Sequence, residues 1–191
     1  MKKFFQDGLD TIVKLIVTQL GMTMFGLMVT MTTRVLPGAA DKTKDPMLLV
    51  VSCFSIIMYL FILYTHIWEK GAKDRIKVDG GRMEKQPFKG LYLSLVANSL
   101  NLLLGIIMCT TYYIFDCIAA PGSFAYQLFG SANDIARLIQ GMYTGIIIYL
   151  SPDATAISPL IFIVITLPAI AVTTFGYYWG FCNKKMLISK K

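Results

Sequence analysis

Four long apolar runs, at residues 11–31, 47–68, 91–115 and 157–181, constrain the fold more than any other feature of this sequence. Each approaches or exceeds the roughly 20 residues that a helix needs to cross about 30 Å of hydrocarbon. The chain is 55% hydrophobic and only 15% charged, whereas soluble domains are roughly 25% charged. The sequence therefore predicts an all-α integral membrane protein, a bundle of four transmembrane helices that forms one domain over residues 1–191.

The first apolar run is longer than the roughly 7 to 15 apolar residues of a secretion signal, so we expect it to be retained as a span. The basic residues then indicate how the spans are oriented. With four crossings, the segments on the amino-terminal side carry two, seven and four Lys or Arg, and the segments on the other side carry three and one. Because Lys and Arg accumulate on the cytoplasmic side, we expect a multi-pass plasma-membrane protein with both termini cytoplasmic.

The net charge of +7 would favour a nucleic-acid partner in a soluble protein. Here the basic residues lie beside the apolar runs, so membrane orientation accounts for them, and the expected partner is the lipid bilayer rather than nucleic acid.

Residues 69–90 form the most charged stretch and, in this topology, the cytoplasmic loop between the second and third spans. Glu69 and Lys73, and likewise Lys70 and Asp74, are spaced i, i+4, which favours a helix that continues to about Val78. The sequence "DGG" at 79–81 is a turn signal, so the loop is predicted as a helical hairpin. It is either a solvated surface or a docking surface for a cytosolic partner or anionic lipid. The docking candidates are Lys73, Arg75 and Lys77.

A further helix is predicted over residues 132–150, because Ser131 and Asp134 form an S-x-x-D start signal. Its first half also contains Arg137 and Gln140, so only its second half is free of charges and amides. Two readings remain open: a helix on the outer face or re-entrant in the membrane, and a fifth span.

Neutral polar residues line one face of two spans. They are Ser94, Asn98 and Asn101 in the third span and Gln19 and Thr23 in the first. Such residues either hydrogen-bond between helices or contact a ligand, in which case they would suit a neutral or zwitterionic solute. We treat all five as candidate ligand-binding residues.

The fourth span contains Pro168 and a G-x-x-x-G pattern at Gly176 and Gly180. Proline cannot donate to the carbonyl of Val164, which predicts a kink. Small residues let helices approach closely, so the two glycines are candidates for packing within the bundle or against a partner.

The spans contain no Asp, Glu, Lys or Arg in their central parts, apart from Lys14 near the start of the first span. Intramembrane proteases and proton pumps need such residues or a metal-ligand cluster. The chain has one histidine, His66, and no phosphate-binding or nucleophile motif. We therefore expect no enzymatic activity, no catalytic residues, no metal and no cofactor.

Two segments, "WEKGAKDRIKVDGGRMEKQPFKGL" (68–91) and "LPAIAVTTFGYYWG" (167–180), resemble parts of small polytopic membrane proteins of Gram-positive bacteria that have no assigned activity. The two segments make up about a fifth of the chain, and the resemblance implies a bacterial plasma membrane. Substrate-binding subunits of vitamin uptake transporters have a similar size, but they usually have six spans, and six are not found here.

Two functional hypotheses follow. The first is a non-enzymatic subunit that packs against another membrane protein in a transport or export complex, or against further copies of itself. The alternative is an autonomous small transporter or channel for a neutral or zwitterionic solute.

Overall fold

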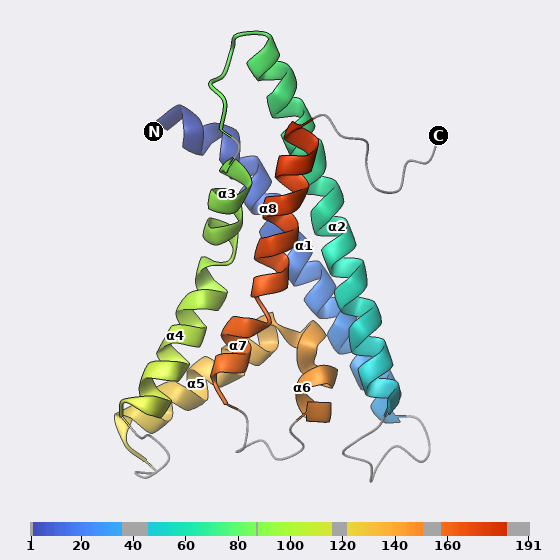
Figure 1. Cartoon of the computed structure of the whole chain (residues 1–191). Coiled ribbons are helices and arrows are strands. Elements are labelled where there is room, and N and C mark those ends of the chain that lie inside the picture. The colour runs from blue at the N-terminus through green and yellow to red at the C-terminus, as the bar shows by residue number, and fades with distance from the viewer. Residues whose placement is uncertain (1, 36–45, 87, 116–121, 151–157, 183–191) are drawn as a thin grey trace. The chain divides into compact units, whose positions relative to one another are not determined.

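The computed structural model describes residues 2–35, 46–86, 88–115, 122–150 and 158–182, and every regular element in these ranges is helical (Figure 1). In chain order the elements are α1 (Lys2–Val35), α2 (Pro46–Asp79), α3 (Lys89–Ala97), α4 (Ser99–Tyr113), α5 (Phe124–Ile139), the 3-10 helix η1 (Gly141–Tyr143), α6 (Thr144–Leu150), α7 (Leu160–Val164) and α8 (Leu167–Phe181). The prediction of an all-α chain is confirmed over these ranges. The four lysines near the carboxyl end lie outside them.

The chain divides into two compact units, which we describe separately. Unit 1 draws on Met1–Thr18, Tyr59–Ser99 and Leu167–Lys191, and unit 2 on Gln19–Met58 and Leu100–Thr166. Helices α1 and α2 therefore contribute to both units, α3 and α8 belong to unit 1, and α5 to α7 belong to unit 2.

Among the described residues, three helical segments are long and apolar enough to cross a membrane: Gly8–Thr32, Pro46–Asp79 and Leu160–Phe181. Helices α3 and α4 make a fourth if the pair, bent by 59° at its break, counts as one span. Only 28%, 33% and 39% of the most apolar stretch of the three segments is buried inside the chain. Lipid is the solvent that matches this exposed apolar surface.

In unit 1, α2 and α8 run parallel and pack through glycines. A Cβ atom at Gly176 would lie 2.7 Å from Cγ2 of Ile67, and one at Gly180 would overlap the carbonyl oxygen of Trp68. Gly71 of α2 is equally close to the backbone of Tyr177. Because none of these glycines has a side chain, the two helix backbones approach closely.

Helix α3 packs on α8 in the opposite direction (Figure 1). A Cβ at Gly90, in the first turn of α3, would overlap Cβ of Tyr177 near the end of α8. On its other side, α3 meets the beginning of α1, where a Cβ at Gly8 would lie 3.0 Å from Cδ2 of Leu93. Close glycine contacts thus fix where α3 begins relative to α8 and α1.

In unit 2, α5 and α6 lie on either side of η1 like the two legs of an arch (Figure 1). Gly141, Met142 and Tyr143 at its apex are buried. The apex packs on the second half of α1, since a Cβ at Gly26 would lie 2.7 Å from Cα of Met142. A Cβ at Gly145, just after the apex, would overlap the backbone of Leu48 in α2. We call α5, η1 and α6 the arch.

The arch corrects the single helix predicted over residues 132–150. Helix α5 begins earlier, because the Oγ of Ser123 caps it by accepting a hydrogen bond from the N–H of Tyr126 at 3.2 Å. Ser131, expected as the cap, lies inside the helix and donates to the carbonyl of Gln127 at 2.9 Å. The helix then stops at Gly141, where close packing on Leu27 leaves no room for a Cβ.

Side chains hydrogen-bond to backbone groups at each of the three helix interruptions. Between α3 and α4, Nδ2 of Asn98 donates to the carbonyl of Ser94 at 3.0 Å. Between α7 and α8, Oγ1 of Thr166 donates to the carbonyl of Ile163 at 2.7 Å. This second break is the interruption predicted from Pro168, although the threonine bonds to Ile163 rather than to Val164.

Side chains of two other helices hydrogen-bond to backbone groups of the arch. Oγ1 of Thr23 in α1 donates to the carbonyl of Ile139 at 2.6 Å. Oγ of Ser52 in α2 accepts from the N–H of Gly145 at 3.0 Å. These two bonds satisfy backbone groups at the interruption and tie it to α1 and α2.

The glycine seam predicts that Gly180→Ala destabilises the protein. Alanine favours a helix by about 1 kcal/mol over glycine, but overpacking against the Trp68 backbone costs about 1–3 kcal/mol. Thermal unfolding of the purified protein in detergent should show a lower Tm. Gly130→Ala is the matched control, because no atom lies within 4 Å of a Cβ there. Equal Tm values for the two variants would contradict the seam.

Candidate functional site: a buried ion pair in unit 1

The buried stripe of α2 continues past the apolar run into the charged segment. Leu63, Ile67, Gly71 and Asp74 follow one another at intervals of three or four residues, and all four are buried. These intervals keep side chains on one face of a helix. The face of α2 that packs Leu63 and Ile67 therefore carries a carboxylate, Asp74, near the carboxyl end of the helix. The Asp74 side chain is 0% exposed.

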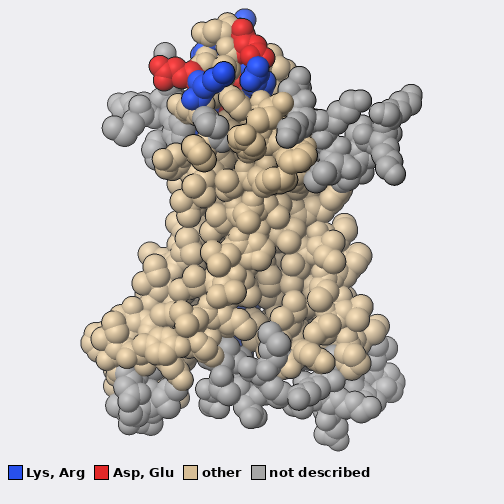
Figure 2. Space-filling model, viewed as in Figure 1, with Lys and Arg blue, Asp and Glu red and all other residues tan. Residues whose placement is uncertain are grey.

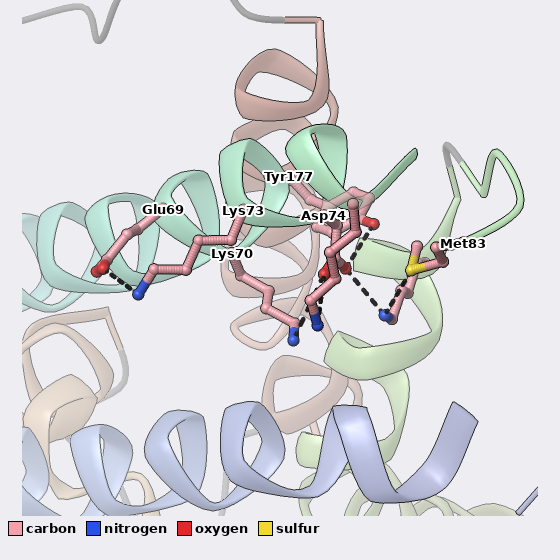
Figure 3. A network of polar contacts seen from close by, with 8 residues as sticks. Glu69, Lys70, Lys73, Asp74, Met83 and Tyr177 are labelled. Atoms are coloured by element: carbon pink, nitrogen blue, oxygen red, sulfur yellow. Dashed lines mark hydrogen bonds and ion pairs between the residues drawn. The ribbon is translucent and has the colours of Figure 1, made fainter. Parts of the chain in front are cut away.

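Three helices converge on Asp74 (Figure 3). Its Oδ2 accepts a hydrogen bond from Nζ of Lys89 in α3 at 2.9 Å and another from the hydroxyl of Tyr177 in α8 at 3.1 Å. Lys89 is 2% exposed and Tyr177 is 0% exposed. The network therefore joins α2, α3 and α8 at a point that water does not reach.

Two further lysines lie on the other side of the carboxylate. Nζ of Lys70 is 3.6 Å and Nζ of Lys77 is 4.0 Å from Oδ1 of Asp74. Oδ1 has no hydrogen-bond partner among the described residues, so these two contacts are ion pairs without a hydrogen bond. The i, i+4 pair predicted between Lys70 and Asp74 is confirmed, but Asp74 also pairs with Lys77 and Lys89.

A tight turn returns the chain so that Lys89 can reach Asp74. The N–H of Gly80 donates to the carbonyl of Ile76 at 3.0 Å, and that of Arg82 donates to the carbonyl of Lys77 at 2.9 Å. Gly81 has φ of 68°, a conformation that favours glycine. The predicted helix end and "DGG" turn are therefore confirmed. Gly90 then lets α3 pack closely against Tyr177. This contact places Lys89, the residue before Gly90, in the core.

The geometry of this site favours holding helices together over acid–base chemistry. Removing a carboxylate and an ammonium group from water is costly, and the cost is offset only when both are paired and hydrogen-bonded. Oδ2 accepts two hydrogen bonds, and the whole side chain is shielded from solvent. Such a pair specifies one arrangement of α2, α3 and α8, because any other arrangement would leave a buried charge unpaired.

The outer surface of the same region is highly charged. On the face shown in Figure 2, charged side chains gather over the end of α2 and the turn after it. Lys73 pairs with Glu69, as predicted, and both are largely exposed. Nε of Arg75 lies 2.9 Å from Oδ2 of Asp79, and its guanidinium lies 5.9 Å from the ring centre of Phe181.

The predicted docking residues thus divide into two kinds. Lys73 and Arg75 are on the surface, each paired with an acid on the same helix, whereas Lys77 belongs to the surroundings of Asp74. Gly176 and Gly180 are buried against α2. Of the two uses predicted for these glycines, the structure shows packing inside unit 1.

The predicted ligand-binding residues are all buried, and they are divided between the two units. Ser94 and Asn98 bond locally at the break between α3 and α4, and both belong to unit 1. Gln19, Thr23 and Asn101 belong to unit 2. Of these, Thr23 bonds to the arch.

Two features were missed from the sequence. The burial of Asp74 has a signal there, because the apolar stripe of α2 extends to it in phase, but its partners Lys89 and Tyr177 are set by tertiary packing. The second is Gln140, which is 2% exposed and lies where α5 gives way to η1. Its Nε2 is 3.5 Å from the carbonyl of Phe162, and its Oε1 has no hydrogen-bond partner among the described residues.

Over the part of the chain that the structure describes, no three His, Cys, Asp or Glu side chains are grouped so as to hold a metal ion. In comparisons with known proteins, no family model matches the chain, and no curated protein or solved structure is significantly similar to it.

The ion pair predicts a strong coupling between Asp74 and Lys89. Asp74→Ala leaves the buried Lys89 ammonium without its carboxylate and should cost about 3–5 kcal/mol of stability. Adding Lys89→Met removes that charge, so the double variant should regain part of the loss. The measurement is a double-mutant cycle on unfolding of the purified protein.

Glu69→Ala is the control for this cycle, because it removes a carboxylate from an exposed pair on the same helix and should change stability little. Additive losses for the two core substitutions would contradict a coupled pair.

Proposed function

We propose that this chain is a non-enzymatic subunit of a membrane transport or export complex and packs against another membrane protein through α1. In this proposal it crosses the plasma membrane four times, with α3 and α4 as one broken span and both termini cytoplasmic. The arch enters the membrane from the outer face and returns.

The direction of the helices in unit 1 supports this topology. Four alternating crossings require the second and fourth spans to be parallel and the third to oppose them. The parallel packing of α2 and α8, and the opposed α3, agree with that requirement. The ends of α2 and α8 and the start of α3 then lie on the side that carries most Lys and Arg, which is the cytoplasmic side in membrane proteins.

The observation that carries the subunit proposal is Gly21, in the second half of α1. Every other described glycine of the membrane-length helices would meet a heavy atom within 3.0 Å if it gained a Cβ, whereas Gly21 would meet none within 4 Å. A glycine in a helix costs about 1 kcal/mol relative to alanine, and the described chain shows no packing that uses this one. Small residues in membrane helices are typical of close contact with another helix.

The residues around Gly21 fit such a contact. Met24 and Met28 follow it on the same exposed face and are 59% and 65% exposed. Methionine side chains are flexible and polarizable, and they are common on surfaces that adapt to a partner. A glycine flanked by methionines would admit the ridge of a neighbouring helix.

A crosslink tests this contact. A photoreactive residue in place of Met28 should give a defined adduct with a second integral membrane protein in native membranes. Gly21→Leu should reduce that adduct about five-fold or more, since overpacking of a helix contact costs about 1–3 kcal/mol.

Gly130→Leu, at the other described helical glycine with open space around it, should leave the adduct unchanged. An adduct with lipid alone, or one insensitive to Gly21→Leu, would refute the proposed partner contact. An adduct between two copies of this chain would show that the partner is a second copy, as in a homo-oligomer.

A second function, an autonomous small transporter or channel for a neutral or zwitterionic solute, is favoured by Gln140. A buried acceptor without a hydrogen bond costs about 1–3 kcal/mol, so Oε1 of Gln140 is suited to a donor supplied from outside the described chain. Broken helices in membrane proteins tend to line the sites where solutes bind. The donor in this proposal is water or a hydroxyl of the solute.

Flux through proteoliposomes tests this alternative, with water and glycerol as probes and stopped-flow light scattering as the readout. Gln140→Leu should reduce protein-dependent permeability while the protein stays folded, because the acceptor at the arch is lost. Gln127→Leu, which alters an exposed glutamine of α5, should leave permeability unchanged. Equal permeability of wild type and Gln140→Leu, or none above empty vesicles, would exclude the transporter reading for these probes.

A further inference from the structure

Among the described methionines, Met83 is the one that lies outside a helix. It is in the turn between α2 and α3, whereas the others belong to α1, α2, α4 and η1. Its neighbours Arg82, Glu84 and Lys85 are charged and exposed, which places the turn in water. Met83 itself is half-buried, so reagents dissolved in water reach its side chain.

The sulfur of Met83 faces the buried ion pair (Figure 3). Nζ of Lys89 donates to Oδ2 of Asp74 at 2.9 Å and also directs an N–H at Sδ of Met83, which lies 4.0 Å away. A thioether is a weak acceptor, so the contact with the sulfur contributes little beside the contact with the carboxylate. The ammonium therefore links the turn to the core of unit 1 through a poor acceptor.

Oxidation of the sulfur would convert this poor acceptor into a strong one. Methionine sulfoxide is polar and carries an oxygen on the sulfur, and an ammonium donates to oxygen at about 2.8 Å. The 4.0 Å between Nζ and Sδ exceeds that distance by about the length of one S–O bond, so the oxygen fits between the two atoms. Because methionine has three rotatable bonds, the oxygen can turn towards Lys89 whichever lone pair reacts.

We propose that Met83 is a site of reversible oxidation and that its sulfoxide oxygen accepts a hydrogen bond from Lys89. The oxidant is a peroxide. A lone pair of the sulfur forms the S–O bond, the O–O bond breaks, and the departing hydroxide takes the proton of the new S–OH group and leaves as water. The sulfur is oxidised by two electrons and the peroxide is reduced. Methionine sulfoxide reductases reverse the change.

The sulfoxide strengthens the attachment of the turn to unit 1. The N–H that Lys89 already directs at the sulfur is the one that the oxygen receives, so the hydrogen bond to Asp74 is kept. The oxidation state of Met83 thus sets how firmly the turn is held against the ion pair. This site is independent of the partner contact at Gly21 and depends only on the turn being in water.

Hydrogen–deuterium exchange of the full chain in lipid nanodiscs tests the site. Hydrogen peroxide is added, and peptide mass spectrometry locates the sulfoxide at Met83. The amides of residues 80–86 should then exchange about ten-fold more slowly, which is the effect of a hydrogen bond to a charged group. Methionine sulfoxide reductase should restore the original rate. Met83→Gln, whose amide oxygen is a permanent acceptor, should give slow exchange without peroxide.

Met83→Leu is the matched control, because it keeps an apolar side chain and has no sulfur to oxidise. Its turn should exchange at the rate of the unoxidised wild type, with or without peroxide. A second variant, Asp74→Ala with Lys89→Leu, removes both charges of the pair together. There, Met83 should still be oxidised, but the exchange of the turn should not slow.

Four results would overturn the proposal. They are no sulfoxide at Met83 under conditions that oxidise free methionine, unchanged or faster exchange of the turn once Met83 is oxidised, equal slowing by peroxide in Met83→Leu, and slowing that persists in the folded double variant. The third would assign the effect to another methionine. If the double variant does not fold, the opposite responses expected of Met83→Gln and Met83→Leu still decide between the sulfoxide contact and a general effect of peroxide.

Discussion

Apolar surroundings offer no hydrogen bonds, and this constraint bears on the buried polar residues of the described helices. A continuous helix satisfies its own backbone, so it can face lipid freely. Each interruption exposes carbonyl and N–H groups that need another partner. At the arch, Thr23 and Ser52 supply such partners. At the other two breaks the side chains of Asn98 and Thr166 add a second hydrogen bond to carbonyls that already accept a backbone N–H. Other neutral polar side chains of the membrane-length helices, such as Thr30, Ser55 and Thr173, donate to carbonyls of their own helix instead.

Charge follows a related rule at the end of unit 1. Asp74 is as shielded from solvent as any apolar core residue, and it is tolerated because an ammonium and a hydroxyl approach it from two other helices. Glycines make this approach feasible: Gly71, Gly90 and Gly180 bring three backbones close enough for short side-chain contacts. The glycine seam and the ion pair depend on each other, because neither geometry is available when the helices are farther apart.

Local patterns in the sequence predicted the elements well. The apolar runs correspond to the membrane-length helices, and the i, i+4 pairs at Lys70 and Glu69 are both present. These features depend on neighbours within one helix turn. The break at Asn98 was not predicted, because no proline or glycine marks it and its partner Ser94 would also suit a straight helix. The early start of α5 was missed because Ser131 carries an equally good capping signal but lies inside the helix.

The candidate site was predicted only in part, for a different reason. The phase of the apolar stripe on α2 places Asp74 on the buried face, and this could have been read from the sequence. Nothing local indicates that Lys89 and Tyr177 meet it, since they lie on separate helices and are joined to it only by packing. The same holds for Gln140, whose buried side chain meets the carbonyl of Phe162 in α7.

The unbroken course of α2 has a consequence for how the chain tolerates change in length. Its 34 residues extend about 51 Å, and one helical register links the apolar stripe at Leu63 and Ile67 to Asp74. Each residue of an α-helix advances the side chain by about 100°. A single inserted or deleted residue between Ile67 and Asp74 would therefore turn the carboxylate away from Lys89 and Tyr177 without altering composition or hydropathy. In this segment, the helical register is therefore more tightly constrained than the identity of most residues.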